Sequence, residues 1–424
     1  MSKIDLIKLY NQGIVKKGVH NLNVPIKKFN GESYSGETYM IPLEYLYYND
    51  QNGRIGVALS EYESTNGRII PGHNEEYNLA IQNMIINDGE NSTKKEMEKL
   101  KRDMHVKGQQ EAGYVLKDGR VIDGNRRFTA KRLLQQDADI TGDQYFEAVI
   151  LNDLSFKNHD DQKKIKSLEL QIQFGKLGKV DYHAIDRAID AYKTVKVNNI
   201  MTAKEYSEYA GFGSTNEVNK RILEAELIVR FLEFSNADPE NYALAKQLEL
   251  DGPIQDLIPQ YKKFKGQDNE TQLLDSIFTK ILQIRITKED YKKSYREIVK
   301  NVVGTKKESN FIEEMEDVTD LIVDALDSSE PIKSNIELTS VLASNKSIST
   351  ALSEVQDITG KFSESVKNHK ERTMPITLMT RAINSLSSID ISVIPHLESK
   401  DKYQLLNKLE ELKFYIDAIK SAGE

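Results

Sequence analysis

Short apolar runs separated by turn-forming residues occupy the first part of the chain and stop near residue 155. Runs of Val, Ile, Leu, Tyr and Phe bounded by Gly, Asp or Asn are typical of strands, and they lie at 40–43, 46–48, 113–116, 121–122 and 146–151. Apolar residues at three- and four-residue spacing predict helices over about 73–87, over about 92–104 and from Arg126 onward. An Asp118-Gly119 turn predicts a hairpin. We therefore expect an α+β domain over 38–155, preceded by a loosely attached polar arm at 1–37.

Helical spacing replaces the strand pattern after residue 155 and continues to residue 424. We expect an all-α helix-turn-helix domain over 156–240, a helical domain over 241–330 and a largely helical C-terminal region over 331–424. A Ser- and Asn-rich stretch around 328–350 marks the last boundary. A chain of 424 residues is long enough for two or three such domains.

Two helix-start signatures follow each other closely in the helical part. Thr202 with Glu205 fits a capping box, in which side chains satisfy free backbone N–H groups. Ser214 with Glu217 repeats the pattern, and the turn at 210–213 is short enough to hold two helices at a steep angle. The spacing predicts a helix-turn-helix whose second helix buries one stripe, made of Val218, Ile222, Ala225 and Val229.

Polar residues at the start of that second helix are the candidate DNA contacts, because recognition helices present their N-terminal residues to bases and phosphates. Asn pairs with adenine, and Lys or Arg pairs with guanine or phosphate. The candidates are Asn216, Asn219, Lys220 and Arg221. The alternative, an ordinary pair of packed helices, is favoured by Glu224 and Glu226, because acidic groups repel a DNA backbone.

The turn at 123–127 carries the most specific chemistry in the sequence. Gly124 lets the backbone approach an anion closely, and a helix that begins here points free N–H groups toward it. Arg126 and Arg127 add guanidinium donors suited to phosphate oxygens. The pattern predicts a phosphate-binding turn; the alternative is a common strand-to-helix connection with two solvated arginines.

Charge is unevenly distributed along the chain, whose net charge is -8. Residues 94–132 hold 12 Lys and Arg against 6 Asp and Glu, whereas 308–330 hold 9 acidic residues and no basic one. The basic stretch surrounds the 123–127 turn and permits local anion binding despite the acidic total. Within 308–330, apolar residues at helical spacing predict an amphipathic helix with a solvated acidic face and a buried stripe made of Ile312, Met315, Thr319, Ile322 and Leu326. The alternative is a surface that docks a partner protein or mimics DNA.

Composition excludes several classes of chemistry. The chain has no cysteine, which excludes disulfides, thiolate catalysis and cysteine-ligated metal. Its seven His residues are scattered, so no metal site is expected from them. No run approaches the roughly 20 apolar residues of a membrane span, and we expect a cytoplasmic protein without membrane contact.

Apolar residues near the C-terminus repeat at alternating four- and three-residue spacing: Leu405, Leu409, Leu412, Ile416 and Ile419. Such a heptad stripe predicts either a homodimer seam or a helix of an intramolecular bundle. We expect a homodimer, because helix-turn-helix proteins commonly bind DNA as dimers.

The order of these pieces resembles that of the ParB/sulfiredoxin-like superfamily, and within it the ParB-type partition proteins, over roughly residues 38–235. Residues 123–130 match the Gly-x-Arg-Arg box that holds nucleotide phosphates in this family. Residues 41–43 with 52–54 are similar to its opening strand and arginine-containing turn, and 108–111 also fit. The resemblance implies CTP or another nucleotide, with Mg²⁺, bound by Arg54, Gly124, Asn125, Arg126 and Arg127.

The third box of the family, Glu-Asn-x-x-Arg, is altered in this chain. Glu169 is retained, but Leu170 and Gln173 stand where the family has Asn and Arg. Because that box holds the triphosphate and its metal, nucleotide hydrolysis is left open. Sulfiredoxin chemistry needs a cysteine in the glycine turn, where this chain has Asn125, and is excluded.

Three functions follow as hypotheses. The first is a ParB-like DNA-binding protein with a nucleotide-binding turn, acting in plasmid or phage partition, in regulation, or in a mobile-element or defence system. The second is a ParB-like metal-dependent nuclease or nucleotide-dependent phosphotransferase, with Asp123 or Glu169 as metal ligand or base. The third is a non-catalytic interaction module in which the 123–127 turn serves the fold alone.

Overall fold

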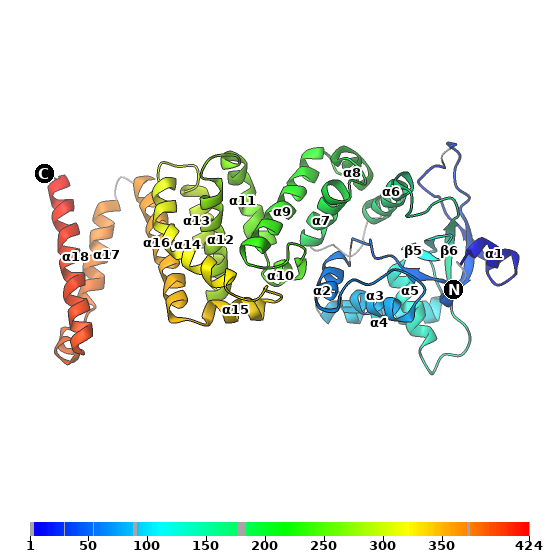
Figure 1. The fold of residues 1–424 in the computed structure, drawn as a ribbon, viewed down its shortest axis with the longest axis horizontal. Helices are drawn as coiled ribbons and strands as arrows, with labels where there is room; N and C mark the ends of the chain where they lie inside the picture. Colours follow the sequence, from blue (N-terminus) through cyan, green and yellow to red (C-terminus); the bar gives the residue numbers. More distant parts are fainter. Residues whose placement is uncertain are drawn as a thin grey trace. The chain divides into compact units, whose positions relative to one another are not determined.

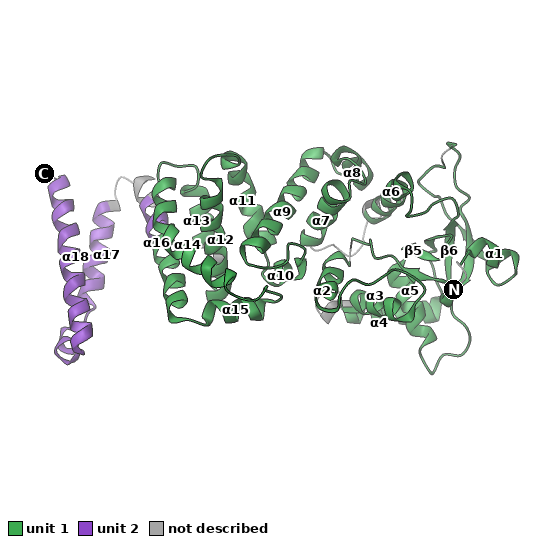
Figure 2. Ribbon diagram, in the orientation of Figure 1, with its two compact units in different colours: residues 1–360 green, residues 361–424 purple. Residues whose placement is uncertain are grey.

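A computed structural model describes residues 4–28, 30–53, 55–87, 91–175, 184–370 and 374–423. A mixed six-stranded sheet with its helices comes first, and a long, mostly helical region follows (Figure 1). The chain divides into two compact units, Met1–Gly360 and Lys361–Glu424 (Figure 2). Within the described residues, no helix is both long and apolar enough to cross a membrane.

Six strands form one sheet in the order β1-β2-β6-β4-β5-β3. The pairs β3/β5 and β4/β6 are parallel, and the other neighbouring pairs are antiparallel. The predicted hairpin is confirmed by β4 and β5, with Gly119 between them at a φ of +90°. The strands are β1 Lys16–Asn21, β2 Glu37–Pro42, β3 Tyr47–Tyr48, β4 Gly113–Leu116, β5 Arg120–Asp123 and β6 Tyr145–Leu151.

The segment expected to be a loose arm contributes the edge strand β1 to this sheet. The pairing of β1 with β2 is irregular between Lys17 and Asn21, and the side chain of Glu147 on β6 fills the gap. Its Oε1 accepts the backbone N–H groups of Val19 (2.8 Å) and His20 (2.9 Å). Polar pairing rather than an apolar run holds β1, which is why its sequence lacks a strand pattern.

Alternating residues of β6 enter two different cores, as the period of a strand requires. Phe146, Ala148 and Ile150 pack in a core that includes residues of α3, α4 and α5. Val149 and Leu151 pack on the opposite face against Ile165 and Leu168 of α6 and their neighbours. The helices of this region are α1 Leu6–Asn11, η1 Leu43–Tyr45, α2 Gly56–Asn66, α3 Glu75–Asn87, α4 Asn91–Lys107, α5 Asn125–Gln135 and α6 His159–Gly175.

The helix α6 joins the sheet to the helical region, because its other side enters a further core through Leu170. That core also contains Tyr206, Val218 and Ile222 from the two helices of the predicted helix-turn-helix. The following elements are α7 Ala184–Tyr192, a π-helix Lys193–Val197, α8 Ala203–Ala210, α9 Thr215–Phe234, α10 Tyr242–Gln247, α11 Asp251–Phe264, α12 Glu270–Thr287, α13 Tyr291–Asn301, α14 Glu308–Asp327, α15 Asn335–Ala343 and α16 Lys346–Lys370.

The acidic stretch at 308–330 forms α14, an amphipathic helix. Met315, Ile322 and Leu326 are buried, as the spacing predicts, and Phe311 joins them, whereas Ile312 is half-buried. The acidic residues therefore lie mainly on the solvated side of a packed helix. The smaller unit contains the end of α16 and three further elements, α17 Met374–Ser387, η3 Ile391–His396 and α18 Ser399–Gly423.

Candidate functional site

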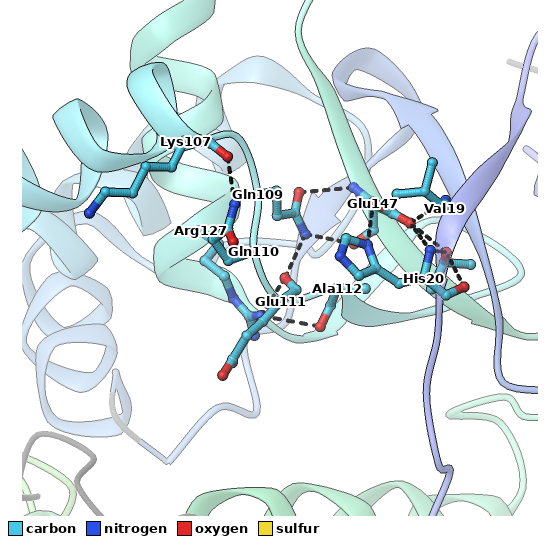
Figure 3. A network of polar contacts seen from close by, with 10 residues as sticks. Val19, His20, Lys107, Gln109, Gln110, Glu111, Ala112, Arg127 and Glu147 are labelled. Atoms are coloured by element: carbon cyan, nitrogen blue, oxygen red, sulfur yellow. Dashed lines mark hydrogen bonds and ion pairs between the residues drawn. The ribbon is translucent and has the colours of Figure 1, made fainter.

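The side chain of Arg127 ties three segments together (Figure 3). Its Nη2 donates to Asp123 Oδ2 (2.8 Å), and its Nη1 donates to the backbone oxygens of Glu111 (2.6 Å) and Ala112 (3.2 Å). Gln109 fixes the same loop from the other side, because its amide donates to and accepts from the backbone of β6. Arg127 thus anchors the first turn of α5, and its guanidinium is committed to oxygens of the protein.

The neighbouring residues of the 123–127 turn have different surroundings. Gly124 is the N-cap of α5 at a φ of +98°, and a Cβ there would lie 2.8 Å from the Phe146 ring. Arg126 donates to Glu96 of α4 (3.1 Å) and keeps 24% of its side chain exposed. Asn125 is buried, and its Oδ1 has no hydrogen-bond partner among the described residues. A phosphate at this turn would have to compete with carboxylates for the guanidinium groups.

Gly53 of the 52–54 turn and Glu169 of the altered third motif are in contact in the structure. The Gly53 N–H donates to Glu169 Oε1 (3.3 Å), and a Cβ on Gly53 would lie 2.6 Å from Asp190 Oδ1 on α7. Gly53 is thus required for close approach of the loop after β3 to the helical region. Arg54, the other residue predicted in this loop, lies outside the described residues.

A buried ionic cluster lies beside this contact. The Nζ of Lys166 on α6 is 2.6 Å from Asp190 Oδ1 and 3.4 Å from Glu169 Oε2. The hydroxyl of Tyr206 on α8 donates to the other oxygen of Asp190 (2.8 Å). Gln173, which stands at the Arg position of the family box, donates to Glu169 (2.9 Å). One buried ammonium therefore faces two carboxylates, and neutral donors satisfy the remaining oxygens.

Burial and the pairing of opposite charges shift the pKa of each of these groups in opposite directions. Burial alone lowers the pKa of Lys166, but the charges of Asp190 and Glu169 outweigh it and raise that pKa above the ordinary lysine value. Burial raises the pKa of Glu169 despite the nearby ammonium. The cluster therefore keeps its lysine charged and makes Glu169 easier to protonate than an ordinary glutamate.

The same residues form part of the wall of a cavity of about 450 Å³, within the roughly 300–1,000 Å³ typical of small-molecule sites. The cavity begins where β3 ends, at the carboxyl edge of the parallel pair β3/β5, where α/β proteins commonly bind ligands. Its polar lining includes Asn49, Asp50, Arg68, Gln162, Lys166, Glu169, Asp190, Lys193 and Asn198.

Asn49 has a free donor in this lining. Its side chain is 1% exposed, and among the described residues its Nδ2 has no hydrogen-bond partner. The adjacent Asp50 is held by Arg120, whose guanidinium is 3.1 Å from it and lies over the Phe156 ring. A buried amide without a hydrogen-bond partner costs free energy.

The structure brings together some of the residues predicted from the sequence and not others. Glu169 lines the cavity, whereas Gly124, Asn125, Arg126 and Arg127 are not among its lining residues. Lys166, Asp190 and Asn49 were missed. Lys166 could have been predicted from the sequence, because it precedes Glu169 by three residues and so lies on the same face of the helix.

At the predicted helix-turn-helix, the structure has two helices, α8 and α9, joined by a turn at 211–214. Thr202 and Glu205 form the predicted capping box, and Gly211 ends α8 at a φ of +70°. The second capping box is wrong, because the Ser214 side chain makes no cap hydrogen bond and Glu217 pairs with Arg221 instead (3.1 Å). Within the expected stripe of α9, Val218, Ile222 and Ala225 are buried and Val229 is half-buried.

The start of α9 presents polar side chains to solvent. Asn216, Asn219 and Lys220 are exposed, while Arg221 is largely covered and stacks over the Phe212 ring at 5.0 Å. A second depression beside Asn219 includes His159, Lys163 and Lys196 in its lining. Lys196 belongs to the π-helix, whose first residue, Lys193, lines the first cavity. Irregular helical turns of this kind are frequent at functional sites.

No protein-family model, curated protein or solved structure matches the chain. Within the described residues, no three His, Asp or Glu side chains are grouped to hold a metal ion.

Proposed function

We propose that this chain is a DNA-binding protein that docks α9 as a recognition helix, in the two-part arrangement of ParB-type partition proteins. The observation that carries the proposal is the first two turns of α9. Asn216, Asn219 and Lys220 face solvent there, while Val218 and Ile222 on the opposite side are buried in the helix-turn-helix core. A helix in this setting offers its N-terminal side chains to the major groove.

The two acidic residues that weigh against DNA binding, Glu224 and Glu226, lie away from that surface. Glu224 is 3% exposed and accepts a hydrogen bond from Gln255 of α11 (2.9 Å), and Glu226 lines a different depression. Glu217 lies in the exposed first turn and pairs with Arg221. In the depression beside Asn219, Lys163 pairs with Glu205, and Lys196 adds positive charge that suits a phosphate backbone.

Titration of a genomic DNA pool with the full chain at several salt concentrations tests this proposal. Lys220→Ala should weaken binding on all sequences and reduce the slope of affinity against salt by about one unit, because one phosphate contact is lost. Asn219→Ala should alter sequence preference at one position. Lys300→Ala on α13 is the control and should leave binding unchanged. The absence of binding at low salt, with no effect of either variant, would reject the proposal.

The cavity beside Gly53 favours a second function, the binding of a small phosphorylated ligand such as CTP or another nucleotide with Mg²⁺. Lys193 and Arg68 supply positive charge, and Asn49 offers its amide. Acidic residues nevertheless outnumber basic ones in the lining, which suits a Mg²⁺-bound nucleotide better than a free phosphate, because the cation offsets the phosphate charge.

Thermal unfolding with CTP, ATP or GTP, with and without Mg²⁺, tests this second function, since a ligand of the folded state raises the unfolding temperature. A shift abolished by Lys193→Ala and kept in Arg126→Ala would place the ligand in the cavity. The reverse result would place it at the 123–127 turn. No shift with any nucleotide would reject nucleotide binding.

We do not propose a metal-dependent nuclease or phosphotransferase. Asp123 pairs with Arg127 at 2.8 Å, and Glu169 is buried beside Lys166. Each candidate carboxylate is already neutralised by a cation of the protein, so neither is placed as a free base or metal ligand.

A further inference from the structure

The smaller unit leaves an unusual amount of apolar surface uncovered. Between residues 375 and 423, none of the described side chains is buried. Leu406, Leu409 and Ile416 on α18 are 60%, 44% and 42% exposed. A helical segment that buries so little gains little stability by itself, and exposed apolar surface of this density marks an interaction site.

Part of the uncovered apolar surface of α18 lies on its heptad seam, whereas Leu406, Phe414 and Tyr415 are exposed off the seam. Leu405, Leu412 and Ile419 occupy one seam position of the heptad, and Leu409 and Ile416 occupy the other. Leu405 and Leu412 are half-buried, so the exposed part of the seam consists of Leu409, Ile416 and Ile419. This part of the seam is available to one further helix.

The charged residues that flank this seam between 405 and 420 are all lysines. Lys413 and Lys420 follow the first seam position, and Lys408 precedes the second, while the other two flanking residues are uncharged. The acidic residues Glu410, Glu411 and Asp417 fall at outer positions of the heptad, and Glu411 pairs with Lys408 within the helix (2.8 Å). Charges at flanking positions set partner choice in helix pairs, because they face each other across the seam.

A second copy of α18 is a poor occupant for this seam. In a parallel pair, Lys408 of one helix would face Lys413 of the other, and in an antiparallel pair flanking positions of the same kind would meet, again lysine against lysine. Like charges directly opposed are destabilising. An anionic membrane is also a weaker match, because α18 as a whole carries nearly balanced charge, with acidic residues at its outer positions.

We propose that the seam of α18 docks an amphipathic helix of another protein that carries Asp or Glu beside its apolar stripe. Leu409 and Ile416 supply the apolar contact, and Lys408, Lys413 and Lys420 select the acidic partner. In this proposal the seam binds another protein and not a second copy of the chain.

Fluorescence anisotropy with the full chain and two synthetic four-heptad peptides tests the charge rule. Both peptides carry Leu at the seam positions; one has Glu and the other Lys at every flanking position. We expect the Glu peptide to bind at least tenfold more tightly than the Lys peptide. Replacing Lys408, Lys413 and Lys420 together by Glu should reverse the preference, while Lys400→Glu, away from the seam, should not. Equal binding of the two peptides would overturn the proposal.

Light scattering and vesicle sedimentation test the other occupants. The paired substitutions Leu409→Asp and Ile416→Asp should abolish peptide binding without changing the mass of the full chain in solution. If these substitutions converted a dimer into a monomer, the seam would be a self-association site and the proposal would be wrong. Sedimentation with vesicles of anionic phospholipid that is lost in the same variant would equally overturn it.

Discussion

The backbone N–H of Gly53 donates to the carboxylate of Glu169 at 3.3 Å, which joins the loop after β3 to helix α6 across 116 residues of sequence. Asp190 lies so close to the Gly53 backbone that a side chain has no room there. The contact connects the sheet-bearing region to the helical region and forms one wall of the cavity. The wall of the cavity and the packing of these two regions therefore depend on the same few residues.

Gly53→Ala should lower the free energy of unfolding by about 1–3 kcal/mol, because the added Cβ would lie 2.6 Å from Asp190 Oδ1 and force a backbone shift. Chemical denaturation measures the change. Gly56→Ala is the matched control, since Gly56 lies in α2 and a Cβ there meets nothing within 4 Å. That control should be neutral or slightly stabilising. Equal effects of the two substitutions would contradict the close approach.

Lys166→Met should lower the free energy of unfolding by about 3–5 kcal/mol near pH 8, because two carboxylates are left buried without a counter-ion. The loss should be smaller near pH 5, since burial raises the pKa of Glu169 and lets it take up a proton. Denaturant titrations at both pH values measure this. Lys204→Met, whose side chain is 79% exposed, should change stability by less than about 0.5 kcal/mol. A variant as stable as the parent at pH 8 would contradict the cluster.

Glu224→Gln should stabilise the protein by about 1–3 kcal/mol above pH 7 and have little effect below pH 4.5. Burial raises the pKa of Glu224 from 4.5 to about 7 in the folded state. The unfolded chain therefore releases this proton at a lower pH than the folded protein does. The contribution of Glu224 to the free energy of unfolding is fully present below pH 4.5 and is lost as the pH rises through 7. Thermal unfolding of both proteins across this range measures the difference. A stabilisation that is the same at every pH would show that Glu224 does not titrate.

Thr202→Ala should lower the free energy of unfolding by about 1 kcal/mol, because the hydroxyl caps the backbone N–H of Glu205 at 3.2 Å. Ser214→Ala, at the corresponding position of the next helix, should cost clearly less, since the Ser214 side chain makes no cap hydrogen bond. Parallel denaturation curves of the two variants measure the contrast. A larger loss in Ser214→Ala would reverse the assignment of the two helix starts.

Local patterns identified much of the sheet and many of the helices. The hairpin at Asp118-Gly119, the capping box at Thr202 and the buried stripe of α14 depend on neighbouring residues, so their sequences contain the relevant information. The edge strand β1 and the helix α2 were missed. β1 is held by the distant Glu147 carboxylate, and α2 has no pronounced apolar face in its sequence, with Val57 its one buried residue.

The sequence by itself determined the residue types available at each site and the local elements that carry them, because helix caps, turns and heptads act over a few residues. The tertiary structure alone decided which of those residues meet. It committed Arg127 to the backbone oxygens of Glu111 and Ala112 and placed Lys166 between Glu169 and Asp190. These choices follow from packing and burial between segments far apart in sequence, where the cost of an unpaired charge selects the partners.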